Sequence, residues 1–130
     1  IPKSVKSGNT VAYGEYLTNS VANCKGCHTT FNIMKMDYEG VPLSGGTEMV
    51  EKVYKYKTPN LTPDPETGHM VNWTEEQFIA RFKLGKTYPD SPMPWDAFSK
   101  MSEDDLGAIY KYLQTVEPCK NEVGAIITKL

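Results

Sequence analysis

The spacing of apolar side chains along the chain predicts an architecture built from a few helices. In segment 75–84, Phe78, Ile79 and Phe82 recur at the intervals that place side chains on one helical face. Segment 103–114 repeats this spacing. Four segments in all are predicted to be helical: 11–21, 75–84, 95–100 and 103–114.

Polar residues and a glycine mark the ends of these helices. Thr74 and Gln77 have the spacing of a capping box, and Ser102 and Asp105 repeat it before the last helix. Gly85 follows helix 75–84, at a position where a glycine in the left-handed helical conformation commonly ends a helix. The boundaries of these helices are therefore predicted from side-chain chemistry as well as from periodicity.

The segment from 30 to 72 has no predicted helix and a single candidate strand region, 50–57. Turn-forming Pro, Asn, Asp, Thr and Gly dominate residues 58–68. A segment of this length without regular structure is unusual inside a compact domain. The difficulty disappears if these residues wrap around a group that is not protein.

Composition narrows the class of protein. The chain has 130 residues, which favours one domain with a modest core, and its 10 Gly and 9 Pro are typical of a loop-rich domain. The net charge of −2 and the lack of a basic stripe argue against a nucleic-acid binder. No apolar run approaches the roughly 20 residues of a membrane-spanning helix. Residues 1–4 have no signal-peptide pattern, so an export signal was either removed or never present.

The most informative motif is Cys-Lys-Gly-Cys-His at residues 24–28, which has the C-x-x-C-H spacing of c-type haem attachment. In the first turn of a helix, Cys24 and Cys27 can both reach the two vinyl groups on one edge of a porphyrin. His28 is then held beneath the ring, where its imidazole can bind the iron. Covalent attachment prevents the cofactor from leaving when the iron changes charge.

Three other interpretations of these cysteines stay open at this point. A thioredoxin-like C-x-x-C would need a βαβ context, whereas this one follows a helix in an α-rich chain. A structural zinc site could use Cys24, Cys27 and Cys119 with His28 or His69, although the chain has no second close-spaced pair. The third is a chance occurrence of the motif in an ordinary globular domain.

The second axial ligand of a haem iron would come from a histidine or a methionine. Met93 lies between Pro92 and Pro94, which restrict the backbone on both sides of it. A thioether binds iron weakly, so a loop that is ordered in advance suits it. Met93 also lies far enough from His28 for the chain to pass round the ring edge. An open or water-bound position is one alternative. The other candidate ligands are His69, Met34, Met36, Met49, Met70 and Met101.

Other residues have both a functional and an ordinary interpretation. Arg81 could pair with the haem propionates or lie exposed on its helix. Trp73 and Trp95 could donate to a propionate or pack in the core. Cys119 has no partner if the first two cysteines hold haem, and it is a candidate for contact with another chain. The apolar tail 123–127 is another candidate, although it could also pack back on the domain.

Several blocks of sequence together resemble class I c-type cytochromes, and more narrowly the cytochrome c domains and subunits of bacterial quinoprotein and flavoprotein dehydrogenases. The resemblance covers residues 13–118 and rests on 14–17, 24–29, 59–64, 73–78, 92–95 and 101–106, with 112–113. It implies that the first and last helices cross, that His28 is the proximal ligand and that Met93 is the distal one. It also implies that Asn60 and Leu61 lie near the haem ring.

The chain departs from that family in three places. Those dehydrogenase subunits usually carry three haem motifs, and this chain has one. The predicted first helix lies one residue further from Cys24 than usual. Cys119 and the sequence Gly68-His69-Met70 are not part of the family pattern.

These observations predict an all-α cytochrome c fold, with three to five helices and long loops around one covalently attached haem. We expect an N-terminal extension over 1–10, a mono-haem domain over 11–118 and a tail over 119–130. His28 and Met93 are the predicted iron ligands. The full predicted haem site comprises Cys24, Cys27, His28, Asn60, Leu61, Trp73, Arg81, Pro92 and Met93.

The predicted function is electron transfer between redox proteins, such as a dehydrogenase and a terminal oxidase, without catalysis by the chain itself. Full coordination of the iron leaves no position for a substrate. One alternative is the haem domain of a larger oxidoreductase, which accepts electrons from a catalytic domain or subunit. A haem protein with an open iron, for ligand sensing or peroxidase chemistry, is another. Because haem is attached to such cytochromes outside the cytoplasm, the resemblance implies a periplasmic or other extracytoplasmic location.

Overall fold

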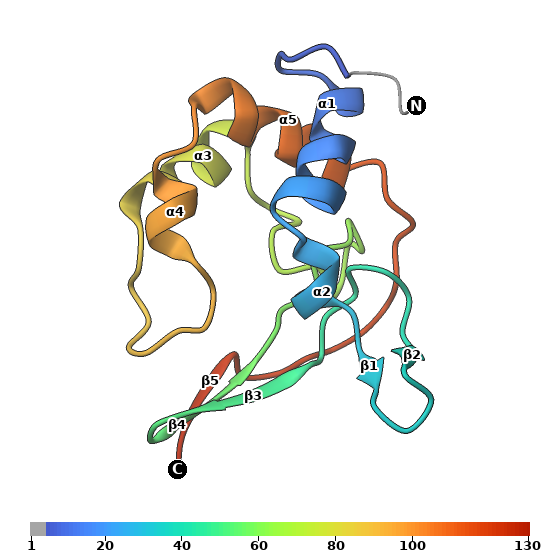
Figure 1. Ribbon diagram of the computed structural model, residues 1–130, viewed down its shortest axis with the longest axis vertical. Coiled ribbons are helices and arrows are strands. Elements are labelled where there is room, and N and C mark those ends of the chain that lie inside the picture. The colour runs from blue at the N-terminus through green and yellow to red at the C-terminus, as the bar shows by residue number, and fades with distance from the viewer. Residues whose placement is uncertain (1–4) are drawn as a thin grey trace.

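The helices nearest the two ends of the chain cross one another in the upper part of the molecule (Figure 1). The computed structural model describes residues 5–130; residues 1–4, on which the expectation about an export signal rests, lie outside the described part. Helix α1 (Val11–Tyr16) packs against α5 (Glu103–Leu113), which also contacts α3 (Glu75–Leu84). The short helix α4 (Trp95–Ser99) packs against α3.

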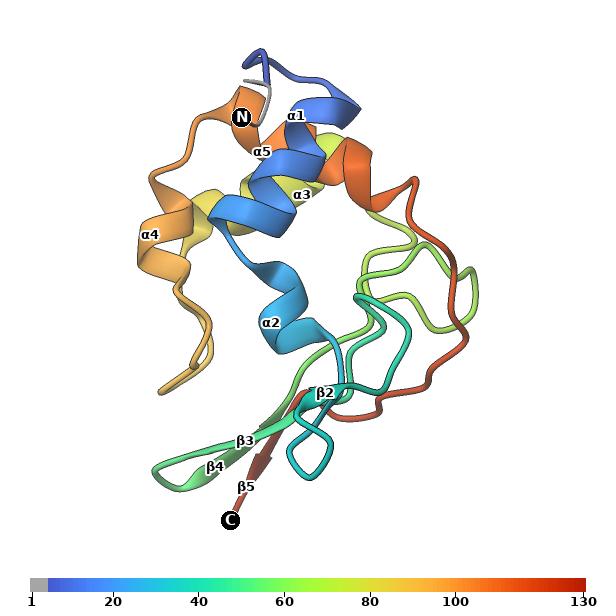
Figure 2. The same ribbon diagram turned by 45° about the vertical axis from the view of Figure 1, so that its right-hand side comes forward.

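The remaining regular structure is short and lies in the lower half of the molecule (Figures 1 and 2). Helix α2 (Cys24–His28) begins at the first motif cysteine. Strands β1 (Phe31–Asn32) and β2 (Asp37–Tyr38) form a hairpin. A second, antiparallel sheet has the order β3–β4–β5, with its strands at Glu48–Glu51, Tyr54–Lys57 and Ile127–Lys129. The tail of the chain therefore returns to pair with a strand from its first half.

The predicted helices agree closely with the structure. Helices α3, α4 and α5 begin at the predicted residues, and the segment predicted over 11–21 is helical throughout. The strand region predicted over 50–57 is the β3–β4 hairpin. The helical, loop-rich architecture is thus confirmed. The structure also contains two small sheets, of which the sequence predicted only the strand region 50–57.

Side-chain caps fix the starts of the helices. At α3, the Thr74 hydroxyl accepts a hydrogen bond from the Gln77 N–H (3.1 Å), and the Gln77 side chain accepts one from the Thr74 N–H (2.9 Å). Ser102 caps α5 by accepting from the Asp105 N–H (3.1 Å). Gly85 follows α3 with a φ of 81°, but its ψ of −153° shows that the predicted left-handed helical conformation is wrong. Almost only glycine can adopt this combination of φ and ψ, which explains why residue 85 is a glycine.

A π-helical turn, η1 (Leu17–Val21), continues α1 toward α2. The Ala22 N–H donates to the Leu17 carbonyl five residues earlier (2.7 Å), which is the hydrogen bond of a π turn. Such a turn holds more residues than an α-helical turn. Leu17, the first residue of this turn, is buried at 3% exposure.

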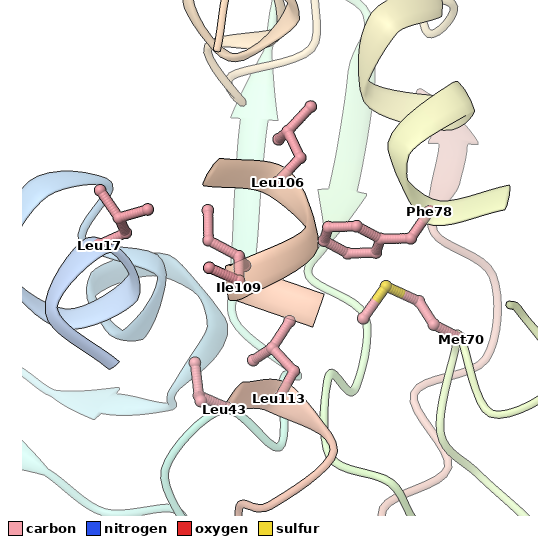
Figure 3. Close-up of a cluster of buried hydrophobic side chains, with 8 residues drawn as sticks. Leu17, Leu43, Met70, Phe78, Leu106, Ile109 and Leu113 are labelled. Carbon is pink, nitrogen blue, oxygen red and sulfur yellow. The ribbon is translucent and has the colours of Figure 1, made fainter. Parts of the chain in front are cut away.

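The apolar core is small and lies where α1, α3 and α5 meet. Figure 3 shows three side chains of α5 between Leu17 on one side and Phe78 on the other. The buried cluster comprises Leu17, Leu43, Met70, Phe78, Leu106, Ala108, Ile109 and Leu113. Two of these residues, Leu43 and Met70, come from the long segment 30–72, so the core also holds that segment in place at two points.

Gly14 is a point of very close approach between α1 and α5. A Cβ atom on this residue would lie 1.9 Å from the Ala108 carbonyl oxygen and 2.9 Å from the Tyr112 Cβ. Both neighbours belong to a packed helix, so neither can move without disturbing the core. The two helices cross at this distance because residue 14 has no side chain.

We expect Gly14→Ala to push α1 away from α5 and to lower the free energy of unfolding by about 1–3 kcal/mol. Urea unfolding followed by circular dichroism measures the change. Gly40→Ala is the matched control, because its added Cβ would meet Thr30 no closer than 3.4 Å. Equal stability of the two variants would contradict the close helix crossing.

Candidate haem-binding site

A sharp turn before α2 positions the C-x-x-C-H motif. Asn23 has φ 52° and ψ 46°, a left-handed conformation that asparagine tolerates better than most residues. Its side chain lies over Gly26, where a Cβ would come within 2.5 Å of the Asn23 Nδ2. Asn23 and Gly26 together turn the chain out of η1 and allow α2 to begin at Cys24.

The imidazole of His28 is held by a loop from elsewhere in the chain. Its Nδ1 lies 3.0 Å from the Pro59 carbonyl oxygen. A carbonyl only accepts hydrogen bonds, so Nδ1 carries the proton and Nε2 does not. Burial lowers the pKa of His28 below its ordinary value, the Pro59 carbonyl acts in the opposite direction, and His69 lowers it further. The ring is therefore neutral at pH 7 with a lone pair on Nε2, the form that binds metals.

Close backbone packing maintains this hydrogen bond. Gly45, with a φ of 78°, donates its N–H to the His28 carbonyl (2.7 Å). A Cβ on Gly45 would lie 2.5 Å from the Pro59 carbonyl oxygen, so a side chain there would push the two loops apart. The Leu61 N–H also donates to the Leu43 carbonyl (2.8 Å). These contacts keep Pro59 next to the imidazole.

An apolar cleft lies between α2, the loop before α4, and helices α3 and α5. It encloses about 1200 Å³, including its open mouth. Cys24 and His28 line it from α2, and Pro92 and Met93 line it from the loop before α4, two segments that stand apart in both ribbon views (Figures 1 and 2). Aromatic residues supply much of the rest: Tyr56, Trp73, Phe78, Phe82, Tyr88, Trp95 and Phe98.

The two motif cysteines have different surroundings. Cys24 is half-buried and borders the cleft, and burial raises the pKa of its thiol to about 11. Cys27 is exposed and is not among the lining residues. At neutral pH Cys24 is therefore a thiol. Within residues 5–130, no three His, Cys, Asp or Glu side chains are grouped so that they could hold a metal ion.

The cleft separates the candidates for the second axial ligand into two groups. Met34 and Met36 are 90% and 74% exposed on the β1–β2 hairpin, and Met49 lies on β3, away from the cleft. Met70 is buried in the core, where Figure 3 shows it beside Phe78. The candidates that border the cleft are His69, Met70, Met93 and Met101.

Met93 lies on a loop that local hydrogen bonds order. The Trp95 N–H donates to the Met93 carbonyl (2.8 Å), and the Trp95 Nε1 donates to the Ser91 hydroxyl (3.3 Å). With the flanking prolines, these bonds restrict the backbone on both sides of Met93. The role of Met93 as an iron ligand stays a prediction.

Arg81 borders the cleft but already has partners within the chain. Its guanidinium donates to the Gly85 carbonyl (2.8 Å) and the Thr87 hydroxyl (2.9 Å), and it lies 3.9 Å from the centre of the Trp95 ring. Since a guanidinium has five N–H donors, this arrangement leaves donors for a propionate. Trp73 also borders the cleft, and its carbonyl accepts a hydrogen bond from the Tyr110 hydroxyl (2.7 Å).

Asn60 contacts the tail of the chain, whereas its neighbour Leu61 borders the cleft. Asn60 is 1% exposed, and its amide donates to the Cys119 carbonyl (2.8 Å). Its side-chain oxygen accepts from the Thr62 N–H (3.0 Å) and hydroxyl (2.7 Å). The Asn60 side chain therefore holds the tail, and Leu61 lines the cleft. The position of these two residues near a haem ring stays a prediction.

The tail packs back on the domain, one of the two outcomes that the sequence left open. The Asn121 side chain donates to the Ser44 carbonyl (2.9 Å), and its N–H donates to the Thr67 hydroxyl (3.0 Å). Further along, Ile126 borders the cleft and β5 pairs with β4. Cys119 is half-buried, and its backbone is bonded to Asn60 and Thr62.

Sequence reasoning missed part of the aromatic wall of the cleft. Tyr56 is 4% exposed while Tyr54, two residues earlier, is only half-buried. The tyrosine-rich strand 54–57 gave a signal for burial, but it could not reveal that Tyr56 reaches the cleft. Nothing local in the sequence distinguishes Tyr88, which stacks edge-on against Tyr56 with ring centres 6.4 Å apart.

The donor set fits a covalently attached haem. A thiol and a neutral imidazole come from one short helix, a thioether comes from an ordered loop, and apolar side chains line the space that they border. This fold and this site define a small electron-transfer protein of the c-type haem class.

The comparison with protein families gives the same class. A family model described as cytochrome c matches residues 11–117. The chain therefore belongs to the cytochrome c family, whose cofactor is haem c, and it is an electron carrier with the predicted cytochrome c fold.

Several bacterial dehydrogenase subunits are similar to the chain. The cytochrome c subunit of a quinone alcohol dehydrogenase from Gluconobacter oxydans is 32% identical over 76% of this chain and 20% of its own length. The fructose dehydrogenase cytochrome subunit of Gluconobacter japonicus is 27% identical over 88% and 23%. The gluconate 2-dehydrogenase cytochrome c subunit of Pantoea cypripedii is 29% identical over 78% and 22%. The match thus spans about a fifth of the length of these relatives. None of the helices within residues 5–130 has the length and hydropathy needed to cross a bilayer.

Proposed function

We propose that this chain transfers electrons through one haem, attached by thioether bonds to Cys24 and Cys27 and ligated by His28 and Met93. The observation that carries the proposal is that Cys24, His28 and Met93 all border one apolar cleft. When bound, the haem iron alternates between ferric and ferrous states and so holds or releases one electron. The protein's contribution is to position the two ligands and to exclude water.

The residues of the cleft favour the reduced state. A methionine opposite a histidine raises the reduction potential of haem iron, and apolar surroundings disfavour the extra positive charge of the ferric form. His28 is neutral and fixed by Pro59, so it needs no proton loss or rotation before it binds iron. Arg81 and Trp73 lie where the rim of the cleft could contact propionates.

We further propose that the chain is the mono-haem cytochrome domain of a dehydrogenase system, with the domain at 11–118 and the tail at 119–130. Support comes from relatives that are named as dehydrogenase cytochrome subunits and that match over a fifth of their length. In this role the chain accepts electrons from a catalytic subunit and passes them to a further redox protein. Because haem is attached covalently outside the cytoplasm in such proteins, we place the chain in the periplasm or another extracytoplasmic compartment.

An exposed hairpin beside the haem motif offers a place for a redox partner to dock. Ile33, Met34 and Met36 are 75%, 90% and 74% exposed between β1 and β2. They lie five to eight residues beyond the end of α2 in sequence, and Figure 1 shows this hairpin below α2. Lys35 pairs with Glu39 (3.6 Å), so the apolar surface carries little net charge. Adaptable methionines and balanced charge fit a protein partner with an apolar face, and the lack of a basic cluster fits an anionic membrane poorly.

Attachment through the motif cysteines predicts that the haem stays with the protein after acid–acetone extraction. Cys24→Ala and Cys27→Ala should each lose one thioether bond, and the double variant should release all its haem. The absorption of the alkaline pyridine complex reports the number of thioether bonds. Cys119→Ala is the control and should behave as the wild type. Extractable haem in the wild type, or no haem at all, would refute the proposal.

Removing the Met93 thioether should open the iron and favour the ferric state. We expect Met93→Ala to bind imidazole readily and to lower the reduction potential by on the order of 0.1 V, a fraction of the roughly 0.8 V that axial ligands can span. Redox titration and absorption spectra measure both effects. Met34→Ala, which changes an exposed methionine, is the control. An unchanged potential in Met93→Ala would transfer the assignment to His69 or Met70.

If partners dock on the hairpin, replacing its apolar tip should slow electron exchange between proteins but leave the haem unaltered. We expect Ile33→Ser/Met34→Ser/Met36→Ser to reduce electron self-exchange at least tenfold, since each buried apolar side chain contributes about 1.5–3 kcal/mol to a contact. Line broadening in the NMR spectra of half-reduced samples gives the rate. Leu84→Ser, at a residue 69% exposed on α3, is the matched control. A triple variant that exchanges as fast as this control would contradict docking at the hairpin.

A further inference from the structure

The loop that carries Met93 is contacted by the three-stranded sheet. Tyr56, on the central strand β4, is paired with Met49 on β3 and with Ile127 on β5. Its hydroxyl donates to the Pro89 carbonyl, and its ring packs edge-on against Tyr88. The sheet therefore contacts the loop four and five residues before Met93.

A second contact joins the same two parts of the molecule. Lys52, in the turn between β3 and β4, lies with its Nζ 3.1 Å from the Asp90 Oδ1. Both residues have positive φ, 54° and 55°, which places them at the tips of their turns. The β3–β4 hairpin and the loop that carries Met93 thus meet through one partly buried hydrogen bond and one largely exposed ion pair.

From these contacts we propose that Tyr56 is a positioning residue for the axial ligand, because its hydroxyl holds the loop in the place where Met93 can bind the haem iron. This inference rests on the proposed ligation by Met93. A thioether is a weak ligand, so the bond to iron persists only if the loop loses little freedom when it forms. By fixing Pro89, the sheet removes much of that freedom in advance.

The surroundings of Tyr56 suit this role. Its side chain is buried, and burial raises the pKa of its phenol, with Asp90, Tyr54 and Tyr88 acting in the same direction. The hydroxyl therefore stays protonated and remains a donor at neutral pH. Strand β5 pairs with the other edge of β4, so the tail of the chain supports the same residue from behind.

The test is Tyr56→Phe in the haem-loaded protein, which removes the hydroxyl and keeps the ring against Tyr88. We expect imidazole to bind the ferric iron about tenfold more tightly than in the wild type, the shift that one net hydrogen bond produces. The sulfur-to-iron charge-transfer band should weaken and the reduction potential should fall. Tyr54→Phe, which removes a hydroxyl from the same strand, is the control and should change none of the three readouts.

A double variant separates positioning from other effects of the tyrosine. In a Met93→Ala background, Tyr56→Phe should leave imidazole affinity unchanged, because the ligand on which it acts is gone. A persisting effect would show that the hydroxyl acts on the cleft directly and would overturn the inference. The inference would also be overturned if Met93→Ala binds imidazole more tightly than the wild type while Tyr56→Phe binds it with wild-type affinity. If Met93→Ala itself leaves the iron closed, the ligand assignment fails instead.

Lys52→Gln gives a second measurement should Tyr56→Phe fold poorly. Lys52 has a side chain 75% exposed, so its replacement does not endanger the core. We expect the variant to bind imidazole more tightly than the wild type, by a smaller factor than Tyr56→Phe because exposed ion pairs are weak. In the wild type, raising the salt concentration should produce the same change. If Lys52→Gln binds imidazole with the same affinity as the wild type, and salt does not change the affinity of the wild type, the contact between the β3–β4 hairpin and the loop that carries Met93 does not position the ligand.

Discussion

The hydrogen bond between the His28 imidazole and the Pro59 carbonyl joins two segments 31 residues apart, and the lower half of the molecule is arranged around it. It selects the tautomer of His28 and so decides which nitrogen faces a metal. Gly45 lets a third segment pack against both partners. Asn60, next to Pro59, then binds the tail through the Cys119 carbonyl. The loop segments around His28, Gly45, Pro59 and Cys119 are thereby joined to one another by hydrogen bonds, in a region with few buried apolar side chains.

The helices have a different task, which is to hold the motif at a constant place relative to the core. Gly14 allows α1 to cross α5 in close contact, and Leu17 continues that contact into the π turn. The π turn then joins this contact to α2, because Asn23, two residues beyond the end of the turn, has a left-handed conformation and α2 begins at the next residue.

Much of this could be predicted from the sequence because the signals are local. Helices α3 and α5 follow from side chains three and four residues apart, and the haem motif is contiguous. The long-range contacts left no such trace. That Asn60 binds the tail and that Tyr56 reaches the loop at Pro89 depend on how loops wrap in space. The conformation of Gly85 was predicted wrongly for a related reason. A glycine with positive φ can adopt more than one ψ, and the sequence specifies only that the residue is a glycine.

The small core and the long loops indicate that a bound cofactor would stabilise the fold as well as carry the electron. The chain exposes 7935 Å², whereas a protein of its mass is expected to expose roughly 6,900 Å². The excess is consistent with extended loops and with the apolar walls of a cleft that Tyr56, Phe82 and Trp95 help to form. A flat apolar group seated between these walls buries surface that no side chain of the loops could fill. In the proposed attachment, a thioether bond at Cys24 would make that burial permanent, and the same bond that retains the electron carrier would also complete the core around which residues 30–72 are folded.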